Sequence, residues 1–332
     1  MKIVILDEYT INPGDLSWSR LEKYGELTVY KRTPKELVVP RIGDAEIVMT
    51  SKCVLTAEVL SRCPNLKWIG VLATGYNMVD LEYASSHNIP VTNIPAYSTD
   101  SVAQFTFSLL LEICNRVGVH SGAVNSGKWQ DADDFCFTLT TQIELAGKTF
   151  GVIGYGSIGR RVSKIAEAMG MKVLIASKYP DPAFESEHIS FTSLDELFAA
   201  SDMISLHCPL REDNKGFINK DSISKMKDGV ILLNTSRGPL INEEDLAQAL
   251  RSGKVSAAGL DVLSVEPPRD VSPLIGLPNC IVTPHIAWIT RESRARLIDT
   301  AVSNLESYLT GKSTNCVNDG VNNKYAYGLN FM

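Results

Sequence analysis

The sequence lacks long apolar runs, an excess of basic residues and clustered cysteines. The most apolar stretch, residues 101–114, is interrupted by Gln104 and Glu112, so we expect no transmembrane helix and no membrane partner. The opening residues MKIVILDEYT reach acidic side chains after a short apolar run, which does not fit a secretory signal. The 32 basic and 38 acidic residues give a net charge of −6, and this balance argues against a nucleic-acid partner.

The seven cysteines are scattered, without a CxxC pair or a Cys/His cluster. A disulfide framework normally needs an even number of cysteines, and a structural zinc site needs closely spaced ligands. Neither is predicted, so we expect a reduced, cytoplasmic protein with no metal. At 332 residues, the chain is long enough for two domains of roughly 150 residues each.

Short β-branched segments alternate with helical patterns along most of the chain, which predicts an α/β fold with parallel sheets. A first series, whose lengths suit a small flavodoxin-like sheet, comprises residues 2–6, 27–30, 46–50, 68–72 and 90–92. A second series comprises residues 149–153, 172–176, 203–207, 230–234, 257–262 and 280–283. Six strands with intervening helices are what a dinucleotide-binding Rossmann domain requires.

Two helical segments mark where the chain passes between the predicted domains. Residues 101–117 form a strong helix candidate before the second strand series, and residues 292–309 form another after it. We therefore expect two doubly wound parallel-sheet domains, one inserted into the other. Residues 1–100 and 289–332 would form a flavodoxin-like domain, and residues 101–288 a Rossmann dinucleotide-binding domain.

A GxGxxG motif, GYGSIG, follows the apolar segment TFGVI and opens a helical pattern. Glycines also mark ordinary turns, but this strand–turn–helix context indicates a dinucleotide-binding fingerprint. Gly154 would permit the tight turn, Gly156 would let the backbone approach a pyrophosphate, and Gly159 would allow close helix–strand packing. The pyrophosphate would lie on backbone N–H groups at the helix N-terminus, beside Ser157 and Ile158.

The end of the next predicted strand indicates which dinucleotide is bound. NAD enzymes usually place a carboxylate there for the ribose 2′-hydroxyl, whereas this chain has Ser177 followed by Lys178. No carboxylate would repel a 2′-phosphate, and a hydroxyl and an ammonium group could bind one. We therefore favour NADP(H) over NAD(H). The alternative is that Lys178 is a solvated loop lysine and that both cofactors are accepted.

Three further segments end predicted strands at the sheet edge where cofactors bind in open α/β folds. They are NTSRGP with Arg237, GLDV leading to Glu266, and TPHIAW with His285. Alone, each residue has an ordinary structural explanation, as a surface arginine, a turn glutamate and a packed loop histidine. Their convergence at one edge favours a catalytic function.

The order of these motifs resembles the D-isomer-specific 2-hydroxyacid dehydrogenase family. Arg237 and Glu266 are 29 positions apart and Glu266 and His285 are 19 apart, which is similar to the family's spacing. The resemblance extends through ATGYNMVDLEYA and IPVTNIPAYSTDSVAQ, so it covers essentially the whole chain. The phrases WQDADDFCF and TPHIAW are most similar to glycerate dehydrogenase/hydroxypyruvate reductase members.

The resemblance implies NAD(P)H-dependent reduction of a small 2-oxo acid, hydroxypyruvate or glyoxylate, to the D-2-hydroxy acid, and the reverse oxidation. In this reaction a hydride reaches C2 while the carbonyl oxygen takes a proton. His285 would act as the general acid, and Glu266 would fix its tautomer. Arg237 would bind the substrate carboxylate and polarise the carbonyl.

The same resemblance implies the remaining binding residues and a homodimer. Asp261 would orient the nicotinamide carboxamide, and backbone N–H groups of Thr74 and Gly75 would bind the substrate carboxylate from the other domain. The other residues lining the cofactor would be Cys208, Pro209, Asn214, Thr235 and Ser236, together with Arg237 and His285.

Two alternatives stay open at this point. The substrate could be another D-2-hydroxy acid, namely D-lactate, 2-hydroxyisocaproate or 3-phosphoglycerate, of which the last is disfavoured because we expect no appended regulatory domain. The second alternative is a non-catalytic, dinucleotide-sensing, corepressor-like protein built on the same fold. The lack of a basic tail or an appended interaction segment weighs against it.

Overall fold

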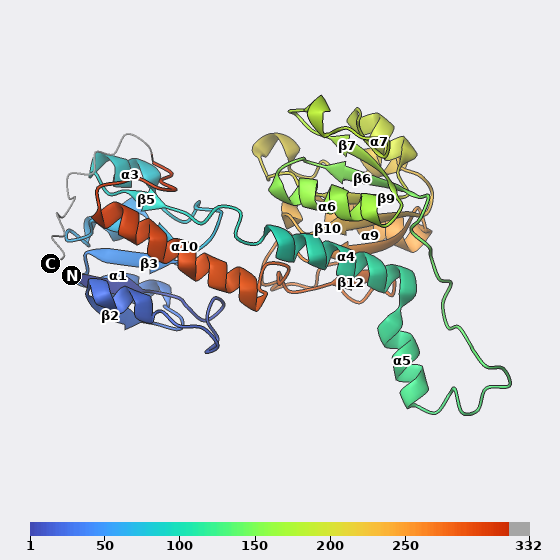
Figure 1. Ribbon diagram of the computed structural model, residues 1–332, viewed down its shortest axis with the longest axis horizontal. Coiled ribbons are helices and arrows are strands. Elements are labelled where there is room, and N and C mark those ends of the chain that lie inside the picture. Colours follow the sequence, from blue (N-terminus) through green and yellow to red (C-terminus); the bar gives the residue numbers. More distant parts are fainter. Residues whose placement is uncertain (319–332) are drawn as a thin grey trace. The chain divides into compact units, whose positions relative to one another are not determined.

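The computed structural model describes residues 1–318 and divides the chain into two compact units (Figure 1). Of the described residues, 1–98 and 289–318 belong to one unit, and 99–288 belong to the other. Each unit is built on a wholly parallel sheet, which confirms the predicted α/β class. The last part of the predicted first domain, residues 319–332, lies outside the described residues.

The five-stranded sheet has the order β2-β1-β3-β4-β5, which is the flavodoxin-like order. Its strands are β1 Lys2–Ile5, β2 Glu26–Val29, β3 Ile47–Thr50, β4 Trp68–Val71 and β5 Val91–Thr92. The helices of this unit are α1 Val38–Ile42, α2 Ala57–Ser61, α3 Leu81–Ser86 and α10 Arg291–Leu309, with the 3-10 turns η1 Ser19–Tyr24 and η2 Lys35–Leu37. All residues of β3 and β4 are buried, as expected for a parallel sheet that is covered on both faces.

The other sheet has seven parallel strands in the order β12-β11-β10-β9-β6-β7-β8. They are β6 Thr149–Ile153, β7 Lys172–Ala176, β8 Ile189–Phe191, β9 Met203–Leu206, β10 Val230–Asn234, β11 Val255–Leu260 and β12 Cys280–Val282. The sequence predicts six strands in this part of the chain, whereas the structure has seven. The additional strand, β8, has three residues at the sheet edge and is too short to show a strand period in the sequence.

The helices of the seven-stranded unit are α4 Thr99–Asn115, α5 Val117–Asn125, α6 Ser157–Ala168, α7 Leu194–Ala200, α8 Lys220–Ser224 and α9 Glu243–Ser252. Its 3-10 turns are η3 Pro182–Phe184, η4 Glu212–Asn214 and η5 Gly238–Leu240. The helix predicted over residues 101–117 ends at Asn115, because Arg116 has a left-handed φ of +48°. The next helix, α5, has no buried residue, and Figure 1 shows it projecting from the sheet of its unit.

Apolar side chains cover both faces of the seven-stranded sheet. On one face, Phe150 of β6 belongs to a buried cluster that includes Phe107 and Leu110 of α4. Another cluster joins Leu232 of β10 to Leu246 of α9. These two layers fix the strands, and so they fix the positions of the polar residues that follow the strand ends.

The order of the seven-stranded sheet reverses between β6 and β9. From β6 the chain proceeds through β7 and β8 to one edge, whereas β9 to β12 extend the sheet toward the other. Ligands of open α/β sheets bind outside the carboxyl ends of the strands at such a switch point. The backbones that follow β6 and β9 are very close there, since a Cβ on Gly154 would lie 2.6 Å from Cys208 N.

Candidate active site

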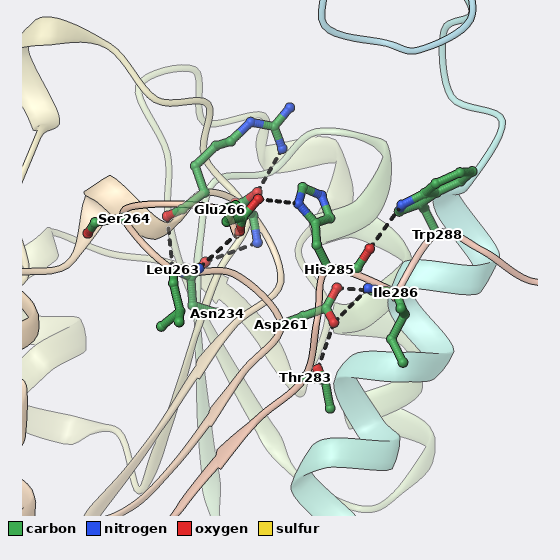
Figure 2. A network of polar contacts seen from close by, with 12 residues as sticks. Asn234, Asp261, Leu263, Ser264, Glu266, Thr283, His285, Ile286 and Trp288 are labelled. Carbon is green, nitrogen blue, oxygen red and sulfur yellow. Dashed lines mark hydrogen bonds and ion pairs between the residues drawn. The ribbon is translucent and has the colours of Figure 1, made fainter. Parts of the chain in front are cut away.

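The three motif segments start at neighbouring strand ends of the seven-stranded sheet. Asn234 at the end of β10 is opposite Leu260 of β11, and Leu260 is opposite Val282 of β12. Because the strands are parallel, the residues that follow them emerge at the same sheet edge (Figure 2). The arginine, glutamate and histidine singled out in the sequence all follow these ends.

His285 and Glu266 form a direct pair. Imidazole Nδ1 lies 2.7 Å from carboxylate Oε2, and Glu266 Oε1 accepts a 3.0 Å hydrogen bond from the N–H of Leu263 (Figure 2). Burial raises the pKa of Glu266, but the hydrogen bond and charge of His285, together with the Leu263 hydrogen bond and the charge of Arg237, outweigh it and bring that pKa below its usual range. The carboxylate is therefore ionised at neutral pH, so Nδ1 is the donor in this bond.

The backbone of His285 has an uncommon conformation. Its φ of +56° lies in the left-handed region, which costs a non-glycine residue about 1–3 kcal/mol. The N–H of His285 donates to Asp261 O at 2.8 Å, and its C=O accepts from Trp288 Nε1 at 3.0 Å (Figure 2). Backbone strain held by surrounding bonds is typical of functional sites, where a side chain must keep one direction.

Asp261 is only 1% exposed, and its carboxylate is hydrogen-bonded within the protein. Oδ1 accepts from Thr283 Oγ1 at 2.7 Å and from Ile286 N at 2.9 Å, while Oδ2 accepts from Ala287 N at 2.8 Å. Burial raises the pKa of this carboxyl, and the three hydrogen bonds counteract part of the rise. Asp261 thus anchors the segment that carries His285, and its orientation of a nicotinamide stays a prediction.

Arg237 is followed by a glycine that allows very close backbone packing. The exposed guanidinium of Arg237 donates from Nη1 to Ser236 O at 2.7 Å, and the backbone C=O of Arg237 accepts from Asn234 Nδ2 at 2.9 Å. A Cβ on Gly238 would lie 1.9 Å from the carbonyl carbon of Leu263, so only glycine fits. The arginine segment is therefore in direct backbone contact with the loop that leads to the glutamate.

The glycine fingerprint forms the tight turn between β6 and α6. Gly154 has a φ of +98°, and a Cβ on Gly159 would lie 2.1 Å from Gly154 O, so both positions require glycine. A Cβ on Gly156 would meet nothing within 4 Å. Among the described residues no side chain caps α6, whose first residues are Ser157 and Ile158. Open space beside uncapped N–H groups fits the pyrophosphate of a nicotinamide dinucleotide.

Ser177 and Lys178 directly follow β7. Ser177 Oγ accepts a hydrogen bond from Tyr179 N at 3.2 Å, and Lys178 Nζ donates to Asp213 Oδ2 at 2.7 Å. The side chains of this ion pair are 62% and 59% exposed. The ammonium group predicted to bind a 2′-phosphate is thus present, but it is already paired with a carboxylate that no sequence motif indicated.

Cys208, Pro209 and Asn214 form a turn after β9. Asn214 Nδ2 donates to Pro209 O at 2.9 Å, and its Oδ1 accepts from Arg211 N at 2.7 Å. Ser236 Oγ donates to Cys208 O at 3.1 Å, which joins this turn to the residues after β10. The positions predicted beside the cofactor after β9 and β10 are therefore connected to one another.

The remaining predicted contact positions have internal partners. Thr235 is 8% exposed and its Oγ1 lies 3.0 Å from Thr106 Oγ1 of α4, so its hydroxyl is directed into the core. Thr74 and Gly75 follow β4 in the other unit, where Thr74 Oγ1 donates to Ile94 O at 2.9 Å. This bond holds the turn after β4, and binding of a carboxylate by its backbone stays a prediction.

Glu243, which no sequence motif indicates, holds the loop that carries Glu266. Glu243 Oε1 accepts from Ser264 N at 2.7 Å, and Oε2 accepts from Ser272 Oγ at 2.5 Å. These two bonds lie on either side of Glu266 along the chain. Glu243 follows Asn242, the N-cap of α9, so in the sequence it looks like an ordinary first-turn carboxylate.

Residues 1–318 contain no group of three or more His, Cys, Asp or Glu side chains that could hold a metal ion. All seven cysteines lie in this range and are free thiols. No helix in the same range is both long enough and apolar enough to cross a membrane.

Comparison with known proteins identifies relatives across the chain. The family profile described as "D-isomer specific 2-hydroxyacid dehydrogenase, NAD binding domain" matches residues 107–287. A hydroxypyruvate reductase of Blautia hydrogenotrophica is 56% identical over 321 residues, which covers 96% of this chain and 100% of the relative. A glycerate dehydrogenase of Methylorubrum extorquens is 37% identical over 320 residues, which covers 95% of this chain and 98% of the relative.

The fold also matches solved structures along nearly its whole length. An acyclic imino acid reductase, Bsp5, in complex with NADPH and D-Arg is 30% identical, with a TM-score of 0.81. The match covers 96% of this chain and 100% of that chain. The similarity therefore extends over the residues of both units.

Proposed function

This chain belongs to the D-isomer-specific 2-hydroxyacid dehydrogenase family, and from that premise we propose that its substrate is hydroxypyruvate or the smaller glyoxylate. The protein is an oxidoreductase that interconverts 2-oxo acids and D-2-hydroxy acids with a nicotinamide dinucleotide. The predicted family and reaction class are confirmed, as is the similarity to glycerate dehydrogenase/hydroxypyruvate reductase members. The choice of hydroxypyruvate is supported by the 56% identity to a hydroxypyruvate reductase.

The observation that carries the catalytic assignment is the 2.7 Å pair between His285 and Glu266. The hydride for C2 would come from a nicotinamide dinucleotide when one is bound, and the carbonyl oxygen needs a proton. Since Glu266 occupies Nδ1, Nε2 is the ring nitrogen that gives this proton to the oxygen and takes it back in the reverse oxidation. The ionised carboxylate keeps Nδ1 as a hydrogen-bond donor and thereby fixes the orientation of the ring.

Substrate binding is assigned to positive charge and backbone donors. Arg237 is exposed at the same sheet edge as His285, and its planar guanidinium suits the carboxylate that neighbours the reacting carbonyl. Thr74 and Gly75 would add backbone N–H groups from the other unit.

NADP(H) is the proposed cofactor, with NAD(H) as the possible alternative. Ser177 and Lys178 at the end of β7 provide a hydroxyl and an ammonium group where NAD enzymes usually have a carboxylate. The related imino acid reductase holds NADPH, which supports the same choice. The backbone at Gly156, Ser157 and Ile158 would bind the pyrophosphate in either case.

We further propose a cytoplasmic homodimer. The helix α5 has no buried residue, and large apolar side chains are exposed along it and on the segment that follows. They include Val117 at 65%, Trp129 at 52% and Phe135 at 89% exposure. An exposed apolar group of this kind is typical of a protein interface, and a second copy would cover it. Free thiols throughout fit a reducing compartment.

Initial rates test the proposal when NADPH and NADH are each combined with hydroxypyruvate, glyoxylate, pyruvate, phenylpyruvate and 2-oxoisocaproate. We expect the highest kcat/KM for hydroxypyruvate or glyoxylate with NADPH. A higher value for pyruvate or a bulky 2-oxo acid would assign a different substrate. A higher value with NADH for every substrate would contradict the cofactor preference. NADPH binding without any turnover would favour the non-catalytic sensor.

A further inference from the structure

Asp213 is bonded to the lysine that follows β7, although the two residues are 35 positions apart. Asp213 Oδ2 lies 2.7 Å from Lys178 Nζ, and both side chains are more than half exposed. Asp213 belongs to η4, a turn closed by the hydrogen bond from Arg211 N to Asn214 Oδ1 at 2.7 Å. The same asparagine donates to Pro209 O at 2.9 Å. The carboxylate is therefore presented to Lys178 by a turn with hydrogen bonds of its own.

Charge at this place matters because NADPH and NADH differ only in the 2′-phosphate of the adenosine ribose. The hydrogen bond from Lys178 lowers the pKa of Asp213, and although burial opposes this effect, the charges of Lys178 and Arg211 add to it, so the pKa lies below its usual range. Asp213 is therefore ionised at neutral pH and neutralises part of the local positive charge. The 2′-phosphate of a bound NADPH would carry between one and two negative charges. It would approach a lysine, Lys178, that is already paired with the Asp213 carboxylate.

We propose that Asp213 is a specificity-determining residue that lowers the affinity for NADPH by competing with the 2′-phosphate for Lys178. NADH has a hydroxyl group at this position and leaves the Lys178–Asp213 pair intact. The preference for NADPH is then smaller than Ser177 and Lys178 would produce without the aspartate. This inference rests on the cofactor site after β7 in the proposed function.

Calorimetric titration of the whole protein with NADPH, NADH and 2′,5′-ADP tests the inference without turnover. Asp213→Asn removes the competing charge, and Glu212→Gln in the same turn is the matched control. Asp213→Asn should tighten binding of NADPH and 2′,5′-ADP by about two- to fivefold at low salt, because an exposed ion pair is worth up to about a fivefold change in affinity. NADH binding should change by less than about twofold, and added salt should reduce the gain.

Lys178→Met shows whether the effect passes through the lysine. With Lys178→Met in place, Asp213→Asn should no longer tighten NADPH binding, and a gain of unchanged size there would overturn the proposed competition. Equal effects of Asp213→Asn and Glu212→Gln would overturn it as well. A wild-type preference for NADH combined with a gain on Asp213→Asn would refute the proposed preference for NADPH and support the inference.

Discussion

The imidazole Nδ1 of His285 and the carboxylate Oε2 of Glu266 are 2.7 Å apart, and the other carboxylate oxygen is bonded to the backbone of its own loop. That second bond, from Leu263 N to Oε1, measures 3.0 Å. One side chain therefore joins the orientation of the imidazole to the path of the loop over residues 263–266. Changes in this loop should affect proton transfer as well as stability.

Substituting His285 by alanine removes the group assigned to proton transfer. Turnover should fall by about 10²–10⁴, the usual contribution of a general acid. Cofactor affinity should change little, because the glycine fingerprint at the start of α6 is untouched. Steady-state kinetics and titration with NADPH measure the two effects separately. A kcat within about tenfold of the wild type would exclude the assigned role.

Replacing Gly238 by alanine should disturb the site through a backbone collision. The added Cβ would lie 1.9 Å from the carbonyl carbon of Leu263, so one of the two segments must move. We expect a loss of about 1–3 kcal/mol in the free energy of unfolding and a lower kcat. Gly122→Ala in α5 is the control, since its Cβ would meet nothing within 4 Å. Equal stability and equal kcat in the two variants would contradict the packing described for Gly238.

Glu243→Ala removes both side-chain acceptors that hold the loop carrying Glu266. Ser264 N and Ser272 Oγ would lose their partner, which should cost about 1–3 kcal/mol in unfolding free energy. We also expect kcat to fall under saturating substrate and cofactor, because the loop would position Glu266 less well. Glu244→Ala, an exposed neighbour in the same helical turn, should change neither value appreciably. Matching kcat values for the two variants would show that the loop holds its position without Glu243.

The convergence of the motif residues could be predicted because it follows from strand periodicity and sheet topology. Parallel strands that end at Asn234, Leu260 and Val282 bring the residues after them to one edge, whatever the detailed loop paths are. The fingerprint around Gly154 was equally predictable, since a tight turn between a strand and a helix restricts the residue types.

The remaining features depend on loop paths, which have no periodic pattern. Asp213 meets Lys178 across 35 positions, and Glu243 meets Ser272 across 29. Each acidic residue lies in the first turn of a helical segment, where carboxylates are common for local reasons. The break at Arg116 was also not predicted, because arginine is an ordinary helix residue and its left-handed φ is set by tertiary packing.

His207, directly after β9, should make the stability of the protein depend on acidic pH. Its Nε2 lies 2.8 Å from Ser205 Oγ, and burial lowers its pKa to about 3. The unfolded chain binds the proton below about pH 6.5 and the folded chain only near pH 3, so the contribution of His207 to stability is lost as pH falls through this window and does not change above it. One such group costs about 1.4 kcal/mol per pH unit, or about 2 kcal/mol between pH 7.5 and pH 5. Urea unfolding of wild type and His207→Gln at both pH values measures the free energy of unfolding. Its decrease between pH 7.5 and pH 5 should be smaller by about 2 kcal/mol in the variant.

His188→Gln, at an exposed histidine, is the control and should retain the wild-type pH dependence. An identical pH dependence in all three proteins would mean that folding does not disfavour protonation of His207.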